Sequence, residues 1–192
     1  MSRARVFVAS SYAALDELLG VRAANRDDVA VLAAGGPAHA VTEALRGEYP
    51  DADDEELEYL ALTAAAQASV PRVGEGGPFR RMVLALDADG AQPAGSEDPT
   101  AVTVGARLLL SDVAAVHVDS DDAAPDVFAA RRAHVAGGED AEELLVRCLD
   151  HELGWYAATE LAEVLAGARG CWTPSPDADQ PGPADLAGHA GS

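Results

Sequence analysis

The chain of 192 residues contains no lysine and no isoleucine, and Asn25 is its single asparagine. The absence of lysine excludes a phosphate-binding loop of the GxxxxGK[ST] type, a Schiff-base lysine and a kinase-type lysine. Lysine, isoleucine and asparagine have AT-rich codons, whereas alanine fills 42 positions. The composition therefore indicates a GC-rich genome rather than a functional selection against lysine.

Positive charge is also scarce. The chain has 33 acidic residues against 13 basic residues, all of them arginine, which gives a net charge of −20. Such a chain is repelled by nucleic acid phosphates and by anionic membranes, so we expect neither as a partner. Adaptation to high salt is an alternative explanation of the acidity, and neither explanation names a function.

Long apolar runs and paired cysteines are missing as well. No stretch approaches the roughly 18 apolar residues of a membrane span, and residues 1–20 do not resemble a signal peptide. The cysteines Cys148 and Cys171 have 22 residues between them and form no CxxC pair or disulfide framework. We expect a soluble cytoplasmic protein without a cofactor, in which Cys148 is a small buried group.

The hydrophobic pattern predicts an α+β domain over residues 1–167. The element order is roughly βαααβββαα, with a small, mostly antiparallel sheet of about four strands covered by helices. Ser11, Thr42 and Asp53 are the predicted N-caps. Residues 168–192 are rich in proline, glycine and alanine and lack periodicity, which predicts a disordered tail. Strands are expected at 3–9, 81–87, 101–110 and 113–119, and helices at 11–19, 38–49, 54–70, 123–135 and 139–166.

The acidic residues are unevenly distributed. Residues 1–50 carry six acids and five arginines, whereas residues 51–70 carry six acids and no arginine. The surplus gathers at the starts of three predicted helices, where the helix dipole favours negative charge. The alternative is an acidic face that meets a basic partner protein, with Glu55, Glu56 and Tyr59 as contact residues.

The segment DHELGWYAATEL, residues 150–161, carries the densest set of chemical groups. On a helix continuing from residue 144, Glu152 falls on the apolar face, and the apolar positions change side after Gly154. We therefore predict a helix junction with a small polar site, in which Glu152 is an acid, a base or a ligand beside His151. The alternative is that Glu152 accepts hydrogen bonds from nearby groups and that Trp155 belongs to the core.

Other candidate motifs are weaker. His151-Glu152 lacks the second histidine of the HExxH zinc helix, so this match is rejected. His39 follows Gly35-Gly36-Pro37 at the predicted start of a helix, where backbone N–H groups can hold an anion. Asp87, Asp89, Asp119 and Asp121 lie at predicted strand ends, but they show no fixed Mg²⁺ or Ca²⁺ spacing, so no metal ligand is assigned.

Five stretches together resemble a family of uncharacterised actinobacterial proteins, a domain of unknown function. The resemblance covers residues 3–166 and brings no catalytic residue with it. It implies a bacterial, single-domain protein, and it draws attention to residues 38–46, 54–59 and 150–156. The stretches are RVFVAS (5–10), AHAVTEALR (38–46), DEELEYLALTAAAQAS (54–69), VAAVHVDS (113–120) and DHELGWYAATEL.

Two functional hypotheses follow. The first is a non-enzymatic binding or regulatory protein that meets a protein partner through its acidic helix faces and through the aromatic pair Trp155-Tyr156. The second is a small hydrolase, metal-assisted or acid–base, that uses Glu152 and His151 with Glu55, Glu56 or Tyr59 across a cleft. The oligomeric state is not indicated.

Overall fold

The structure is a computed structural model that describes residues 3–20, 29–74, 77–168 and 172–174. Helices and strands alternate in an order that confirms the mixed class. The strands are β1 (Arg3–Ser10), β2 (Ala30–Leu32), β3 (Pro37–Ala40), β4 (Met82–Asp89), β5 (Gln92–Pro93), β6 (Ala101–Thr103), β7 (Leu108–Leu109), β8 (Val113–Asp119) and β9 (Leu153–Ala157). The α-helices are α1 (Tyr12–Gly20), α2 (Glu43–Glu48), α3 (Asp54–Ser69), α4 (Ala124–Ala136), α5 (Ala141–Arg147) and α6 (Leu161–Gly167).

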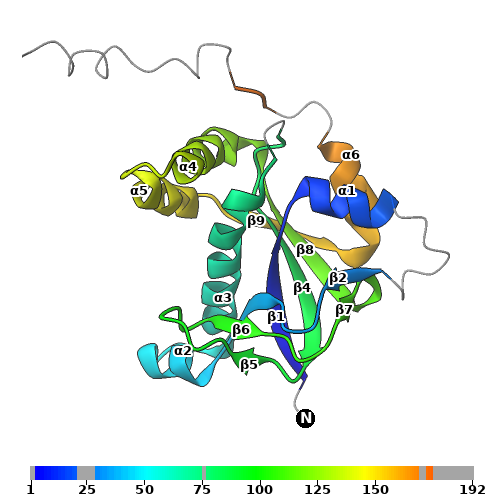
Figure 1. Cartoon of the computed structure of the whole chain (residues 1–192), viewed down its shortest axis with the longest axis vertical. Coiled ribbons are helices and arrows are strands. Elements are labelled where there is room, and N and C mark those ends of the chain that lie inside the picture. Colours follow the sequence, from blue (N-terminus) through cyan, green and yellow to red (C-terminus); the bar gives the residue numbers. More distant parts are fainter. Residues whose placement is uncertain (1–2, 21–28, 75–76, 169–171, 175–192) are drawn as a thin grey trace, which may run out of the picture.

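The main sheet has seven strands in the order β5-β6-β3-β1-β4-β8-β9, and every pair in it is antiparallel (Figure 1). The prediction of about four strands is therefore wrong, although its antiparallel character is confirmed. Strands β1, β4 and β8 were predicted, and the single strand expected at 101–110 is instead the two short strands β6 and β7. Strands β3, β5 and β9, which have two to five residues each, were not predicted. Such short strands carry too few residues for alternation to be recognised.

Strand β4 lies inside the sheet, between β1 and β8, as its continuous apolar run predicts. It pairs with β1 over eight residues, from Arg3 opposite Asp89 to Ser10 opposite Met82. The five residues 82–86 are completely buried. Both faces of this strand are covered, so apolar residues are favoured at every position instead of alternating with polar ones. This explains the pattern MVLAL.

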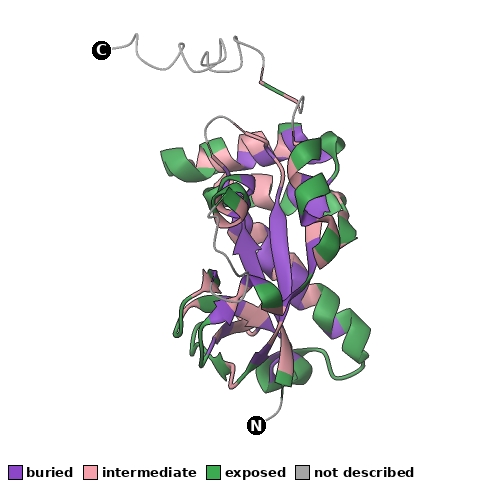
Figure 2. Ribbon diagram, turned by 90° about the vertical axis from the view of Figure 1, so that its right-hand side faces the viewer, coloured by how far each residue is buried: buried purple, intermediate pink, exposed green. Residues whose placement is uncertain are grey.

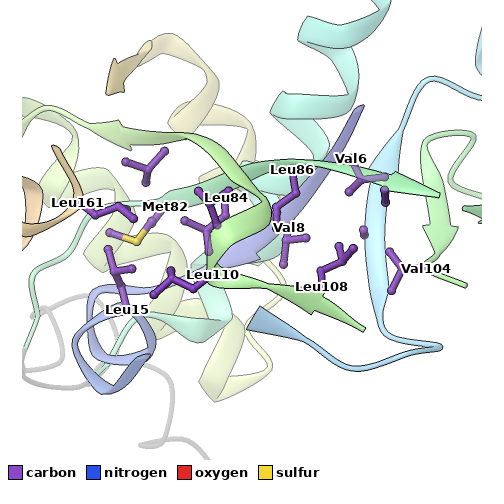
Figure 3. Packing of buried hydrophobic residues seen from close by; sticks show 14 of the residues in the cluster. Val6, Val8, Leu15, Met82, Leu84, Leu86, Val104, Leu108, Leu110 and Leu161 are labelled. Atoms are coloured by element: carbon purple, nitrogen blue, oxygen red, sulfur yellow. The ribbon is translucent and has the colours of Figure 1, made fainter. Parts of the chain in front are cut away.

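Helices cover both faces of the sheet (Figure 2). On one face, α1, α6 and the two-stranded sheet β2-β7 enclose the largest apolar cluster, in which Leu15, Leu84 and Leu161 meet (Figure 3). On the other face, α3 packs Ala61, Ala65 and Ala66 against the sheet. Alanine has a small side chain, so it lets the helix approach the strands closely.

Two predicted helices are wrong in part. The helix expected at 38–49 is instead strand β3 followed by the shorter α2. The helix expected at 139–166 is α5, strand β9 and α6, joined by 3-10 turns. Thr42, Ser11 and Asp53 nevertheless accept the capping bonds expected of them, from the N–H groups of Leu45, Ala14 and Glu56.

A third cluster joins α4 and α5 to the end of α3, around Phe79 and Cys148. Within the stretch predicted as a tail, Trp172 packs its ring edge against Phe79 with ring centroids 5.9 Å apart. The remainder of that prediction, residues 175–192, lies outside the described residues. In the part of the chain that the structure describes, no helix is long and apolar enough to cross a membrane.

Candidate functional site

An open groove of about 800 Å³ lies at the junction of α2 and α3. Its walls include the rings of Tyr49 and Tyr59, which are 46% and 55% exposed. Among the described residues, no arginine lines it, whereas four acidic residues do: Glu48, Asp51, Glu55 and Glu56. The predicted contact residues Glu55, Glu56 and Tyr59 thus lie together, and the structure adds Glu48, Tyr49 and Asp51 to them.

The groove is fixed by the way α3 begins. The Asp53 carboxylate accepts a hydrogen bond of 2.9 Å from the Glu56 N–H, and the Glu56 carboxylate accepts one of 2.9 Å from the Asp53 N–H. This capping box was predicted from the sequence, and it confirms that part of the acidity serves the helix start. The nearby Arg46 guanidinium pairs with Asp54 at 2.7 Å, so this cation is used outside the groove.

Three groove carboxylates have no such role. Among the described residues, no hydrogen bond or ion pair engages the side chains of Glu48, Asp51 or Glu55, all of which are exposed. Helix capping explains Glu56 but leaves these three unexplained. Tyrosine faces attract cations, and carboxylates pair with guanidinium and ammonium groups. The groove therefore has the chemistry of a site for cationic side chains.

The polar site predicted at a helix junction is not formed. Residues 153–157 are an edge strand, and Glu152, just before it, is exposed. The prediction that Glu152 lies on the apolar face of a helix is therefore wrong. Helical periodicity failed here because the strand gains its hydrogen bonds from β8, a partner distant in sequence.

His151 belongs to a structural network instead. Its Nε2 lies 2.9 Å from the Asp126 carboxylate, which also accepts a hydrogen bond of 2.8 Å from Arg147. The His151 carbonyl accepts a hydrogen bond of 2.7 Å from Arg81. These contacts tie the segment before β9 to α4 and to the start of β4. None of these contacts brings His151 near Glu55 or Tyr59, and among the described residues no hydrogen bond or ion pair engages the Glu152 side chain.

The Arg81–Asp119 ion pair was missed by sequence reasoning. Arg81 donates from Nε at 2.9 Å and from its terminal nitrogen at 2.7 Å to the two oxygens of Asp119, and both side chains are at most 1% exposed. The sequence did contain a signal for this pair. Arg81 directly precedes one apolar strand run, and Asp119 ends another. Nearby, burial raises the pKa of the Cys148 thiol to about 11, which keeps it protonated and confirms its reading as a buried group.

Three of the four aspartates at the predicted strand ends form ion pairs with arginines. Asp87 pairs with Arg5 at 2.7 Å, and Asp121 pairs with Arg80. In the described part of the chain, no group of three or more His, Cys, Asp or Glu side chains could hold a metal ion. Asp87, Asp119 and Asp121 are therefore accounted for by ion pairs, whereas Asp89 is exposed and no described residue forms an ion pair with it.

His39 lies on β3, not at the start of a helix, so the predicted anion site has the wrong geometry. Its Nδ1 lies 2.8 Å from the Thr100 hydroxyl, which donates a hydrogen bond of 2.7 Å to Asp98. Burial lowers the pKa of His39, and the nearby Asp98 carboxylate opposes this in part. The contact fastens β3 to the loop that precedes β6.

Trp155 and Tyr156 are exposed on β9, by 63% and 40%. They do not form one aromatic patch, because adjacent residues of a strand point to opposite faces. Trp155 lies opposite His117 of β8, and Tyr156 lies opposite Val116. Figure 1 shows the α2–α3 junction at the lower end of the molecule, away from β9. The two predicted contact surfaces are therefore separate.

Comparison with known proteins identifies a family but no characterised relative. A family model described as a family of unknown function (DUF6912) matches residues 4–165. No curated protein and no solved structure matches the chain.

Proposed function

Since the chain belongs to this family of unknown function, whose model spans residues 4–165, we propose that it is a non-enzymatic binding or regulatory protein whose groove at the α2–α3 junction takes a basic segment of a protein partner. The observation that carries the proposal is the conjunction of two half-exposed tyrosines with three carboxylates that no described residue engages. Cationic side chains satisfy both features at once.

Arginine fits this groove better than lysine does. A guanidinium group can stack on a tyrosine ring and present paired donors to a carboxylate, whereas an ammonium group is a compact, strongly hydrated charge. The carboxylates are exposed, so each contact contributes little and weakens as salt is added. A segment with several arginines would therefore bind through the sum of several contacts.

The proposal extends to location and origin. We place the protein in the cytoplasm as part of the same proposal, and the GC-rich composition supports an actinobacterial source. Fractionation of a native host would test the location, and recovery in the culture medium would contradict it. The net charge of −20 disfavours nucleic acid and anionic membranes as the partner.

The test measures binding of a synthetic peptide of alternating arginine and glycine by fluorescence anisotropy. The variant Glu48→Gln/Glu55→Gln is expected to bind it about tenfold more weakly, which corresponds to the loss of about 1.4 kcal/mol. Tyr59→Leu is expected to weaken binding too, since it removes a cation–π surface. Glu56 is left unchanged because its carboxylate caps α3.

The matched control is Glu58→Gln together with Glu143→Gln. Both residues are exposed acids outside the groove, so the control changes the net charge by the same amount. Its affinity for the peptide is expected to stay close to that of the unmodified protein. Equal weakening by the control and by the groove variant would mean that only the overall charge attracts the peptide, and the proposal would be wrong.

A further inference from the structure

The two edges of the seven-stranded sheet differ in how they are protected. At one edge, β5 has only two residues, one of which is Pro93, and proline lacks a backbone donor. At the other edge, β9 has five residues, LGWYA, without a proline or a charge. Exposed edges are normally blunted by short length, charge, proline or a bulge, because unpaired backbone groups attract other strands. The β9 strand is longer than β5 and carries neither a charge nor a proline.

A hydrogen bond between β8 and the residue before β4 shows which backbone groups of β9 point away from β8. The Asp119 N–H donates to the Arg81 carbonyl at 3.2 Å, so Asp119 and alternate residues of β8 face β4. Val116 and Val118 therefore face β9, through Tyr156 and Gly154. The backbone groups of the remaining β9 residues must point away from β8, because successive residues of a strand alternate in direction.

The end of β9 supports the same assignment. The Ala157 N–H donates to the Glu160 carboxylate at 2.7 Å rather than to β8. The N–H and C=O groups of Leu153 and Trp155 therefore point outward, and no hydrogen bond from another described residue engages them. The edge offers two donors and their neighbouring acceptors, which suffice for a short added strand.

The side chains suit an added strand on both faces. Trp155 stands on the face that His117 shares, and Tyr156 stands on the opposite face above Gly154. A strand laid along the edge would bring its alternate side chains against one aromatic ring on each face. Aromatic pairs across strands stabilise a sheet through contact area that a charged neighbour cannot supply.

The charges beside β9 decide between possible occupants. Asp150 and Glu152 precede the strand and Glu160 follows it, so both ends of the edge are acidic. A second copy of the chain would bring the same acids together. Residues 175–192 contain three prolines and no arginine or lysine, so they suit the edge poorly. A foreign segment with basic ends complements it.

We propose that the β9 edge pairs with an extended segment of a partner protein that has alternating apolar residues between arginines or lysines. This is a second interaction surface, distinct from the groove, and its main contacts are backbone hydrogen bonds rather than side-chain charges. It goes beyond the proposed function and does not depend on the groove.

The test uses amide hydrogen exchange by NMR with the peptide Arg-Arg-Val-Thr-Val-Thr-Val-Arg-Arg. In the protein alone, the amides of Gly154 and Tyr156 are expected to exchange slowly and those of Leu153 and Trp155 quickly. Added peptide is expected to slow exchange at Leu153 and Trp155 by about tenfold or more, since only paired amides are protected. The same peptide N-methylated at its five central residues is expected to give no protection.

Two variants separate backbone pairing from side-chain contact. Trp155→Thr removes the ring and keeps the outward N–H, whereas Trp155→Pro removes both. The first is expected to weaken peptide binding and the second to abolish it. The groove variant Glu48→Gln/Glu55→Gln is expected to retain protection at Leu153, which makes failure of one surface distinguishable from failure of the other.

Three outcomes would overturn the proposal. Protection by the N-methylated peptide would show that pairing is not involved. Equal binding of a peptide with glutamates in place of the arginines would show that the acidic ends are irrelevant. Protection at Leu153 and Trp155 that rises with protein concentration, without peptide, would identify a second copy as the occupant instead. If Trp155→Pro fails to fold, Trp155→Thr and the N-methylated peptide still decide the question.

Discussion

Asp119 and Glu55 carry the same charge in very different surroundings. Asp119 is buried. Its carboxylate accepts two hydrogen bonds from the Arg81 side chain and one of 2.8 Å from the Arg81 backbone N–H. Glu55 faces solvent in the groove beside Tyr59, and no described residue engages its carboxylate. One acid belongs to a buried ion pair, whereas the other has no partner among the described residues.

The comparison shows that the acidic residues behind the net charge of −20 have different structural roles. Some acids pair with the few arginines across strands, some cap helices, and a remainder lines the groove. The proposed function depends on the acids of the groove and not on the paired or capping acids. The variants below separate these groups, beginning with the largest expected effect.

Asp119→Ala should be strongly destabilising. It leaves the Arg81 guanidinium buried without its counter-charge, which typically costs about 3–5 kcal/mol of unfolding free energy. Urea denaturation followed by circular dichroism measures the change. The double variant Arg81→Met/Asp119→Leu should be less destabilised than Asp119→Ala, because it buries no lone charge. If the single variant were as stable as the unmodified protein, the internal role of this acid would be refuted.

Asp53→Ala should lower stability by about 1 kcal/mol, because the Glu56 N–H loses its capping acceptor. Glu55→Ala is the control, since Glu55 opens the same helix and makes no capping bond. Its effect should stay within about 0.5 kcal/mol, as is usual for exposed sites. Thermal or urea unfolding of the two variants side by side checks the difference. Equal losses would mean that helix position, and not the capping bond, decides the role of these acids.

His39→Gln should change how stability depends on pH. Burial lowers the pKa of His39 in the folded protein below its ordinary value of 6.5, so the unfolded chain binds the proton more readily. The unmodified protein should therefore lose stability as the pH falls through 6.5, and the variant should lose less. Urea unfolding at about pH 7.5 and about pH 5 measures this difference. An identical pH dependence in both proteins would contradict it.

Neutralising the groove should have the smallest effect on stability. Glu48→Gln/Asp51→Asn/Glu55→Gln removes three exposed charges that no described residue engages, so the unfolding free energy should change by no more than about 0.5 kcal/mol in total. Any change should be a slight gain at low salt, because like charges no longer repel. A large decrease in the urea concentration at the unfolding midpoint would mean that these acids stabilise the fold. It would contradict the distinction between the groove acids and Asp119.

Local patterns were predicted well. Helix α3 and its capping box follow from residues a few positions apart, and strands β1, β4 and β8 follow from long apolar runs. Of the residues that line the groove, Glu55, Glu56 and Tyr59 were singled out from the sequence as contact residues, whereas Tyr49 and the groove itself were not predicted. Tyr49 reaches the groove only because the turn after α2 brings it there.

The segment around residue 152 was misread for a physical reason. Its apolar residues fit a helical stripe about as well as a strand, and β9 is formed by pairing with β8, more than thirty positions earlier. The same long-range pairing separates Trp155 from Tyr156 and turns a predicted helix junction into a sheet edge. The Arg81–Asp119 pair was missed because its partners are 38 positions apart.

By itself, the sequence determined the α+β composition, the N-caps of α1, α2 and α3, the buried strand β4 and the concentration of acids near residues 51–58. These depend on contacts within a few residues, on hydrophobic period and on composition. Only the tertiary structure decided the number of strands, the state of both sheet edges and which acids have arginine partners. Those depend on hydrogen bonds and ion pairs between distant segments, and such pairings leave no local pattern in the sequence.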